Sequence, residues 1–90
     1  MQYHILVNSK NRRTLELIFK TPTPSNIYWK DIESLFRTVG CEISESSGSR
    51  VRVKCKGERA VFHRPHPRPE TDKGAVISVK RFLQNIGVQP

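Results

Sequence analysis

The sequence predicts an α+β domain in which helices cover one face of a three-stranded antiparallel sheet and leave the other face open. Two observations carry this prediction. Residues 41–63 contain three short segments of alternating apolar and polar residues, separated by turn signals, and such alternation is typical of half-buried strands. The segments on both sides have apolar residues at helical spacing. Ninety residues suit one such domain with a modest core.

The first element is a helix at residues 8–20. Asn8 or Ser9 can act as its N-cap, because a short polar side chain accepts a hydrogen bond from the first turn. Its apolar side consists of Leu15, Ile18 and Phe19. The run TPTPSN at 21–26 ends it, since proline lacks an N–H and disfavours helix in the residue before it. We therefore expect residues 1–26 to form an N-terminal helical extension with a proline-rich joint, followed by a domain at 27–90.

A second helix is predicted at residues 27–39, with Ser25 or Asn26 as its cap. Its apolar positions follow the i, i+3, i+4, i+7 pattern: Ile32, Leu35, Phe36 and Val39. Trp29 falls at the edge of the same face. Gly40 stands where a helix ends most easily.

Three strands follow, at 41–45, 50–55 and 58–63. SSGS at 46–49 is the first turn, and Lys56-Gly57 is a tight hairpin turn. In the middle strand, alternation separates an inward row from an outward row. The inward row is Val51, Val53 and Cys55, and the outward row is Arg50, Arg52 and Lys54.

The run RPHPRPETDKG at 64–74 predicts a loop, and a last helix is predicted at about 74–86. Thr71 or Asp72 can begin this helix and Gly87 can end it. Its apolar face consists of Val76, Val79, Leu83 and Ile86, with Phe82 beside it.

The composition points to an anionic partner. The net charge is +8, and seven of the sixteen Lys and Arg residues lie in 48–69, together with a single acid, Glu58. Such clustering favours nucleic acid, an anionic membrane or an acidic protein as the partner. No apolar run approaches the roughly 20 residues that span a bilayer, and the N-terminus lacks the pattern of a signal peptide. We expect a cytoplasmic protein that does not bind membranes.

The two cysteines, Cys41 and Cys55, occupy apolar positions of the pattern and are expected to be reduced. Together with His63 and His66 they do not follow any usual zinc-site spacing. We therefore expect no metal and no other cofactor. Five of the seven aromatic residues are expected in the core, and none lies in the cationic row, which argues against base stacking on the sheet. The five are Tyr28, Trp29, Phe36, Phe62 and Phe82.

Four segments, in this order and spacing, resemble the HicA family of bacterial toxins. They are YWKDIESLFRTVGCEISE, GSRVRV, HRPHP and KGAVISVKRFLQNIGV, and together they extend over about residues 27–88. The resemblance implies a fold like that of a double-stranded-RNA-binding domain. It also implies a toxin of a type II toxin–antitoxin system, an mRNA interferase that a HicB-like antitoxin neutralises.

The chain departs from the family at one position. The family's catalytic histidine follows the Gly-Ser pair directly or one residue later, whereas here Arg50 and Val51 follow Gly48-Ser49. Metal-independent RNA cleavage needs a base, an acid and a cation near the phosphate. A histidine with an ordinary pKa of about 6.5 suits the first two roles. We therefore expect His66, together with His63, to replace the missing histidine, with Arg50 as their electrostatic partner.

The expected phosphate-binding residues are Arg50, Arg52, Lys54, Arg59, Arg64 and Arg68. They would contact the backbone of RNA with little sequence preference. Three alternatives stay open at this point. The protein can be a non-catalytic module of the same fold that binds RNA or an antitoxin. It can be a basic protein associated with DNA or the ribosome, or the charged strand can be an ordinary solvated face.

Overall fold

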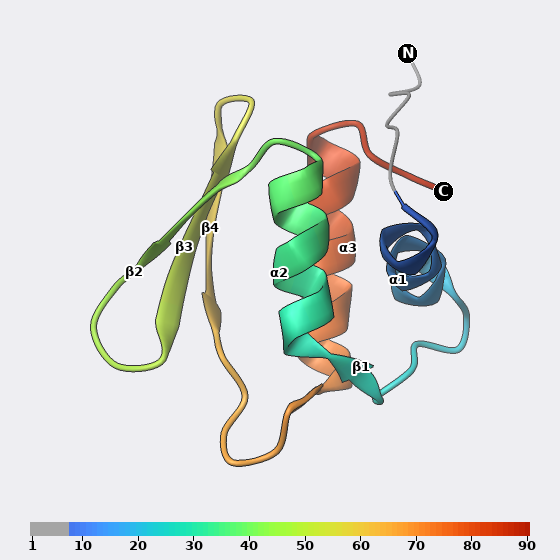
Figure 1. Ribbon diagram of the computed structural model, residues 1–90, viewed down its shortest axis with the longest axis horizontal. Helices are drawn as coiled ribbons and strands as arrows, with labels where there is room; N and C mark the ends of the chain where they lie inside the picture. Colours follow the sequence, from blue (N-terminus) through green and yellow to red (C-terminus); the bar gives the residue numbers. More distant parts are fainter. Residues whose placement is uncertain (1–7) are drawn as a thin grey trace.

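The computed structural model describes residues 8–90 and confirms the α+β prediction (Figure 1). Residues 1–7 of the expected N-terminal extension lie outside the described residues. The elements are, in order, α1 (Ser9–Phe19), β1 (Ile27–Tyr28), α2 (Trp29–Thr38), β2 (Glu42–Glu45), β3 (Arg50–Cys55), β4 (Glu58–His63), β5 (Glu70–Thr71) and α3 (Lys73–Asn85).

The elements form three layers (Figure 1). The first layer is the antiparallel sheet, with strand order β2-β3-β4. Helices α2 and α3 form the second layer and cover one face of this sheet. Helix α1 lies on the far side of the two helices, where it packs against α2 and α3. The outer face of the sheet is therefore left without a covering element in the part of the chain that the structure describes.

Strands β3 and β4 have the predicted bounds, and the turn between them explains their register. Lys56 has φ 52° and Gly57 has φ 80°. Positive φ at both central residues defines the two-residue turn whose twist matches that of a hairpin. The turn pairs Cys55 with Glu58, and the register then runs unbroken to Arg50 and His63.

The core lies between the sheet and the helical layer. The inward row of β3 is buried as predicted, with Val51 and Val53 completely inaccessible. Four aromatic rings meet above it, with centroids 5.6 to 6.2 Å apart in the contacting pairs: Trp29, Phe36, Phe62 and Phe82. These stacked, tilted and edge-on pairs stabilise the core beyond the burial of apolar area. The core prediction for Tyr28 is wrong, because 43% of its surface is exposed.

The start of α2 differs from the prediction. Residues 27–28 form β1, which pairs with β5, so the helix begins at Trp29. Neither Ser25 nor Asn26 caps it, since the N-cap position is Tyr28, whose side chain makes no capping hydrogen bond. The Trp29 N–H donates instead to the Pro69 carbonyl at 3.0 Å. This small sheet therefore anchors the loop after β4 to the base of α2.

The other helix ends agree with the sequence prediction. Asn8 caps α1 and Asp72 caps α3, each by accepting a hydrogen bond of 2.8 Å from the backbone N–H three residues later. Gly40 and Gly87 follow α2 and α3 with φ of 95° and 80°. In both cases two backbone hydrogen bonds return to the last helical turn, which is the Schellman arrangement.

Helix α1 docks onto the helical layer through apolar and polar contacts. Leu15 and Ile18 are buried in the common core. The Asn11 side-chain amide donates to the Thr38 hydroxyl at 2.7 Å, and Lys10 pairs with Asp31 at 3.2 Å. The division of the chain at residue 26 stays a prediction. No helix among the described residues is long and apolar enough to cross a membrane.

Candidate nucleic-acid interface

The outer face of the β2-β3-β4 sheet carries the cationic row that the sequence predicts. Along β3, exposed and buried residues alternate without exception, and the exposed ones are Arg50, Arg52 and Lys54. Their charged groups therefore point away from the helices. The neighbouring strand adds Arg59 and His63 to the same face.

The strand register sorts these residues into three cross-strand rows. In the first row, Arg50 lies opposite His63. In the second, Arg52 lies between Ser44 and Val61. In the third, Lys54 lies between Glu42 and Arg59. Four of the six side chains that β3 and β4 contribute to these rows are permanently cationic, and Glu42 is the one acid on this face of the three strands.

Arg50 and His63 are distant in the sequence but lie directly opposite each other in the sheet. The Arg64 N–H donates to the Ser49 carbonyl at 2.8 Å, which makes Ser49 and Arg64 a hydrogen-bonded pair. The adjacent pair, Arg50 and His63, is then of the other type, in which opposite side chains approach most closely. The fold therefore brings a guanidinium and an imidazole together on the open face.

His66 lies elsewhere. It is exposed in the loop between β4 and β5, three residues beyond His63, and its peptide bond to Pro67 is cis. No hydrogen bond or ion pair joins His66 to another residue between positions 8 and 90. The structure thus places His63, rather than His66, on the same face as Arg50.

Arg64 occupies a position different from the other predicted phosphate-binding residues. Its side chain points toward the helices, where Nε donates to Glu33 Oε2 at 2.8 Å and Nη2 to Glu33 Oε1 at 3.3 Å. Its Nη1 donates to Glu45 at 3.0 Å. Two carboxylates therefore neutralise the charge of Arg64, which no longer faces the open side of the sheet.

Glu33 is the centre of a buried polar network. Only 5% of its surface is exposed, and it accepts hydrogen bonds from the Trp29 indole and from Arg37 as well as from Arg64. Burial alone raises the pKa of Glu33, but the hydrogen bonds from Arg64 and Trp29 and the charges of Arg64 and Arg37 outweigh it, so the pKa is lowered. The hydrogen bonds of Arg64 to Glu33 and Glu45, together with the charges of these two acids, raise the pKa of Arg64.

The sequence contained a signal for this network that the interpretation above missed. Glu33 lies between Ile32 and Leu35 on the apolar side of α2, and a buried acid requires a partner. Trp29 and Arg37 stand four residues before and after it, within helical reach. The third partner, Arg64, is 31 residues away and becomes visible only in the fold.

Arg68 lies on the loop before β5 and is highly exposed. Its nearest acid is Glu70, at 3.7 Å from Nε to Oε1. This residue is not on the sheet face, so it flanks the three rows rather than belonging to them. The predicted phosphate-binding residues therefore divide into four on the open face, one inside a salt-bridge network and one on the loop.

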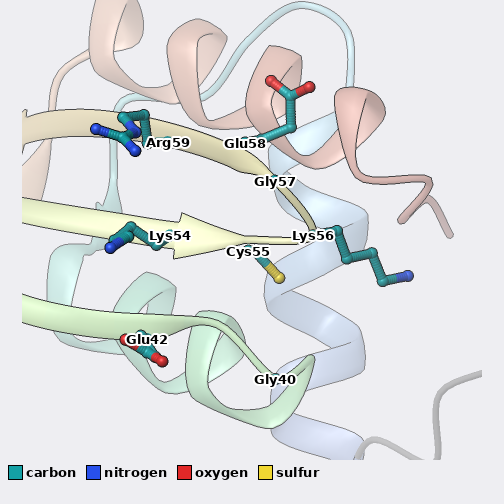
Figure 2. A pocket seen from close by; sticks show the side chains of 8 residues that line it. All are labelled: Gly40, Glu42, Lys54, Cys55, Lys56, Gly57, Glu58 and Arg59. Atoms are coloured by element: carbon teal, nitrogen blue, oxygen red, sulfur yellow. The ribbon is translucent and has the colours of Figure 1, made fainter.

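A shallow open hollow of about 250 Å³ lies at the turn end of the sheet, around the third row. Figure 2 shows the side chains of Glu42, Lys54 and Arg59 rising from three neighbouring strands on the same face. No ion pair joins Glu42 to either cation within residues 8–90. Lys54 and Arg59 thus face each other across the strands as like charges.

Cys41 and Cys55 are free and buried beneath this end of the sheet. Burial raises the pKa of the Cys41 thiol, and a hydrogen bond between this thiol and Cys55 raises it further, which keeps Cys41 protonated at neutral pH. Within residues 8–90, no group of three or more His, Cys, Asp or Glu residues is arranged to hold a metal ion.

The order α2-β2-β3-β4-α3, with helices on one face of the sheet and cations on the other, defines a small basic α+β domain. A family model described as HicA toxin of bacterial toxin-antitoxin matches residues 29–88, and the chain belongs to this family. The match extends from the start of α2 past the end of α3, so α1 lies outside it. No curated protein and no solved structure matches the chain significantly. The family makes this protein a toxin of a toxin–antitoxin system and implies an antitoxin partner.

Proposed function

We propose that this HicA-family toxin is a cytoplasmic, metal-independent endoribonuclease that binds mRNA on the outer face of its sheet and cuts it there. The observation that carries the proposal is the first row, in which His63 lies opposite Arg50 on an open cationic face. An imidazole beside a guanidinium offers both a proton carrier and a charge for the phosphate. This pairing supports His63 as the replacement for the histidine that the family has after Gly-Ser.

The reaction is a transesterification at phosphorus. The imidazole of His63 takes the proton of the ribose 2′-OH, and the 2′ oxygen attacks the phosphorus. The bond from phosphorus to the 5′ oxygen breaks, leaving a 2′,3′-cyclic phosphate and a 5′-OH that receives a proton from an acid. Arg50 stabilises the negative charge that develops on the phosphorane. His66, on the adjacent loop, is the acid that we propose.

The same face suits an acidic partner. We propose that a HicB-like antitoxin neutralises the toxin by covering the cationic rows, since complementary charge guides such association. The partner would then exclude RNA by occupying the residues that bind phosphate. High salt should weaken both complexes for the same reason.

A non-catalytic module is the second candidate function. The observation that favours it is Arg50, which occupies the position of the family histidine after Gly48-Ser49. Such a protein would bind RNA or its antitoxin through the same face and would cut nothing.

Cleavage of a labelled mRNA by the purified chain, with EDTA present, separates the two candidates. We expect wild-type cleavage, and a loss of roughly 100-fold or more in His63→Ala, the range of a general acid or base. Arg50→Ala should lose activity, and Arg12→Ala, an exposed charge on α1, should keep it. Thermal unfolding verifies that each variant is folded. Full activity in His63→Ala, His66→Ala and Arg50→Ala would refute the catalytic assignment, and RNA binding without cleavage would establish the binding module.

A further inference from the structure

We propose that the sheet binds one extended single strand of RNA whose backbone runs along β3, with three successive phosphates at the three cross-strand rows. The inference rests on the proposed function in one respect, that RNA is the ligand of this face. It adds the form of the substrate and assigns a phosphate position to each row. The rows are Arg50 with His63, Arg52 with Val61, and Lys54 with Arg59.

The spacing of the rows is the first argument. Residues two apart on a strand face the same side and lie about 6.7 Å apart. β3 therefore presents one cation per 6.7 Å or so, in a nearly straight line, at Arg50, Arg52 and Lys54. This repeat is comparable with the separation of successive phosphates in an extended nucleic-acid strand. In a duplex the phosphates curve away around the helix axis, so a flat row of cations follows them less well.

The third row supplies the second argument. Lys54 and Arg59 are direct cross-strand partners, and like charges in this position destabilise a sheet. Glu42, on the other side of Lys54, forms no ion pair with either of them among the described residues. Figure 2 shows both cations on the same face at the open hollow. A phosphate between the two would turn the repulsion into two favourable contacts.

The middle row contributes something different. Arg52 is its single cation, and its cross-strand partner Val61 has 47% of its surface exposed. An exposed valine between two charged rows offers an apolar contact to a ribose or to the face of a base. The middle row therefore combines one phosphate contact with one apolar contact, as a strand with unpaired bases requires.

The chemistry of cleavage gives the third argument. Attack by the 2′ oxygen requires that oxygen, the phosphorus and the leaving 5′ oxygen to lie nearly in line. Stacked A-form RNA holds the 2′ oxygen away from this line, whereas an extended strand is free to adopt it. A substrate that is extended across the sheet thus presents the phosphate at His63 in a reactive geometry.

The test uses single-stranded 2′-O-methyl oligonucleotides, which cannot be cleaved, from a dinucleotide to a hexanucleotide at low salt. Wild-type affinity should rise with each phosphate up to the tetranucleotide, which has three. The double variant Lys54→Ala/Arg59→Ala should lose the gain between tri- and tetranucleotide. For this variant, the slope of the logarithm of the binding constant against the logarithm of the salt concentration should decrease in magnitude by about 0.7, the value for one lost phosphate contact with a single strand. The matched variant Arg12→Ala/Arg13→Ala removes two exposed charges from α1 and should keep the wild-type profile.

A second arm compares a single strand with the same strand annealed to its complement. We expect tighter binding of the single strand. Tighter binding of the duplex would refute the proposed path of a single strand along the three rows. An equal effect of Lys54→Ala/Arg59→Ala and Arg12→Ala/Arg13→Ala would refute it as well, while RNA binding itself would remain established. If no RNA bound at low salt, the proposed function would fail instead, so the two failures are distinguishable.

Discussion

Arg52, on β3, and Arg64, the residue after β4, belong to the same basic stretch of the sequence, yet the fold gives them opposite environments. Arg52 stands on the outer face of the sheet, exposed and with an exposed valine as its cross-strand partner. Arg64 turns toward the helices, is 34% exposed at its side chain, and donates to the carboxylates of Glu33 and Glu45. The difference follows from strand alternation, which sends residues 52 and 64 to different sides.

The basic residues that cluster in one stretch of this sequence therefore do not share a single role. A cationic side chain that lies on an open face without an acidic partner is available to bind a phosphate. A guanidinium that donates its hydrogen bonds to a buried carboxylate stabilises the fold, because the acid would otherwise be buried without a counter-charge. The following changes test this distinction.

The largest effect is expected from Arg64→Ala. The substitution leaves the carboxylate of Glu33 buried with weaker partners, and breaking such a pair costs about 3 kcal/mol in the free energy of unfolding. Urea denaturation measures the change. Arg68→Ala provides the control, because this arginine is highly exposed and its Nε lies 3.7 Å from Glu70 Oε1, which is too far for a hydrogen bond. This substitution should change the free energy of unfolding by less than about 0.5 kcal/mol. Equal effects of the two substitutions would contradict the assigned difference.

A pH effect of intermediate size is expected from Glu33. Its pKa in the folded protein is lowered from 4.5, so the folded state binds fewer protons than the unfolded state near that pH. The stabilisation is therefore complete above pH 4.5 and is lost as the pH falls through the folded pKa. In Glu33→Gln the stability should be lower at neutral pH and should decline less on acidification. If the free energies of unfolding of the wild type and Glu33→Gln changed in parallel between about pH 6 and pH 3, the lowered pKa of Glu33 would be refuted.

A smaller effect, on RNA binding rather than stability, is expected from Arg52→Ala. Removing one exposed phosphate contact should weaken binding roughly three-fold and lower the salt slope by about 0.7. Fluorescence anisotropy with an uncleavable single strand measures both. Arg64→Lys keeps the charge near Glu33 and should leave the salt slope unchanged. If the salt slope decreased more in Arg64→Lys than in Arg52→Ala, Arg64 rather than Arg52 would be the residue that contacts a phosphate.

The smallest effect is expected from Glu45→Ala. Glu45 is the exposed partner of Arg64, with 73% of its side chain accessible, and water screens such pairs. The unfolding free energy should change by about 0.3 kcal/mol. A loss as large as that of Arg64→Ala would place the stabilising contact at Glu45 rather than at the buried Glu33.

Much of the fold could be predicted from local patterns. The bounds of β3 and β4 were correct because strict alternation and the Lys56-Gly57 turn define them together. Asn8 and Asp72, each one of two cap candidates in the sequence, are the observed caps, and the helix ends at Gly40 and Gly87 were correct, since each depends on a few neighbouring residues.

The errors lie where distant residues decide. The β1–β5 pair joins two strands of two residues each, and such short segments show no periodicity in the sequence. The pair displaced the predicted start of α2 from residue 27 to Trp29. The environment of Arg64 was missed because Glu33 is 31 residues away. The catalytic residues expected from the sequence, His66, His63 and Arg50, stay a prediction, to which the strand register adds that His63 lies opposite Arg50.

The most direct test of the central claim, that RNA lies on the outer face of the sheet, is an NMR titration of the labelled protein with an uncleavable single strand. The largest chemical-shift changes should occur at Arg52, Val61 and His63, and the signals of α1 should not change. His63→Ala should retain the binding while it loses cleavage. Shift changes concentrated on α1, with β3 and β4 unchanged, would show that RNA does not lie on the outer face of the sheet.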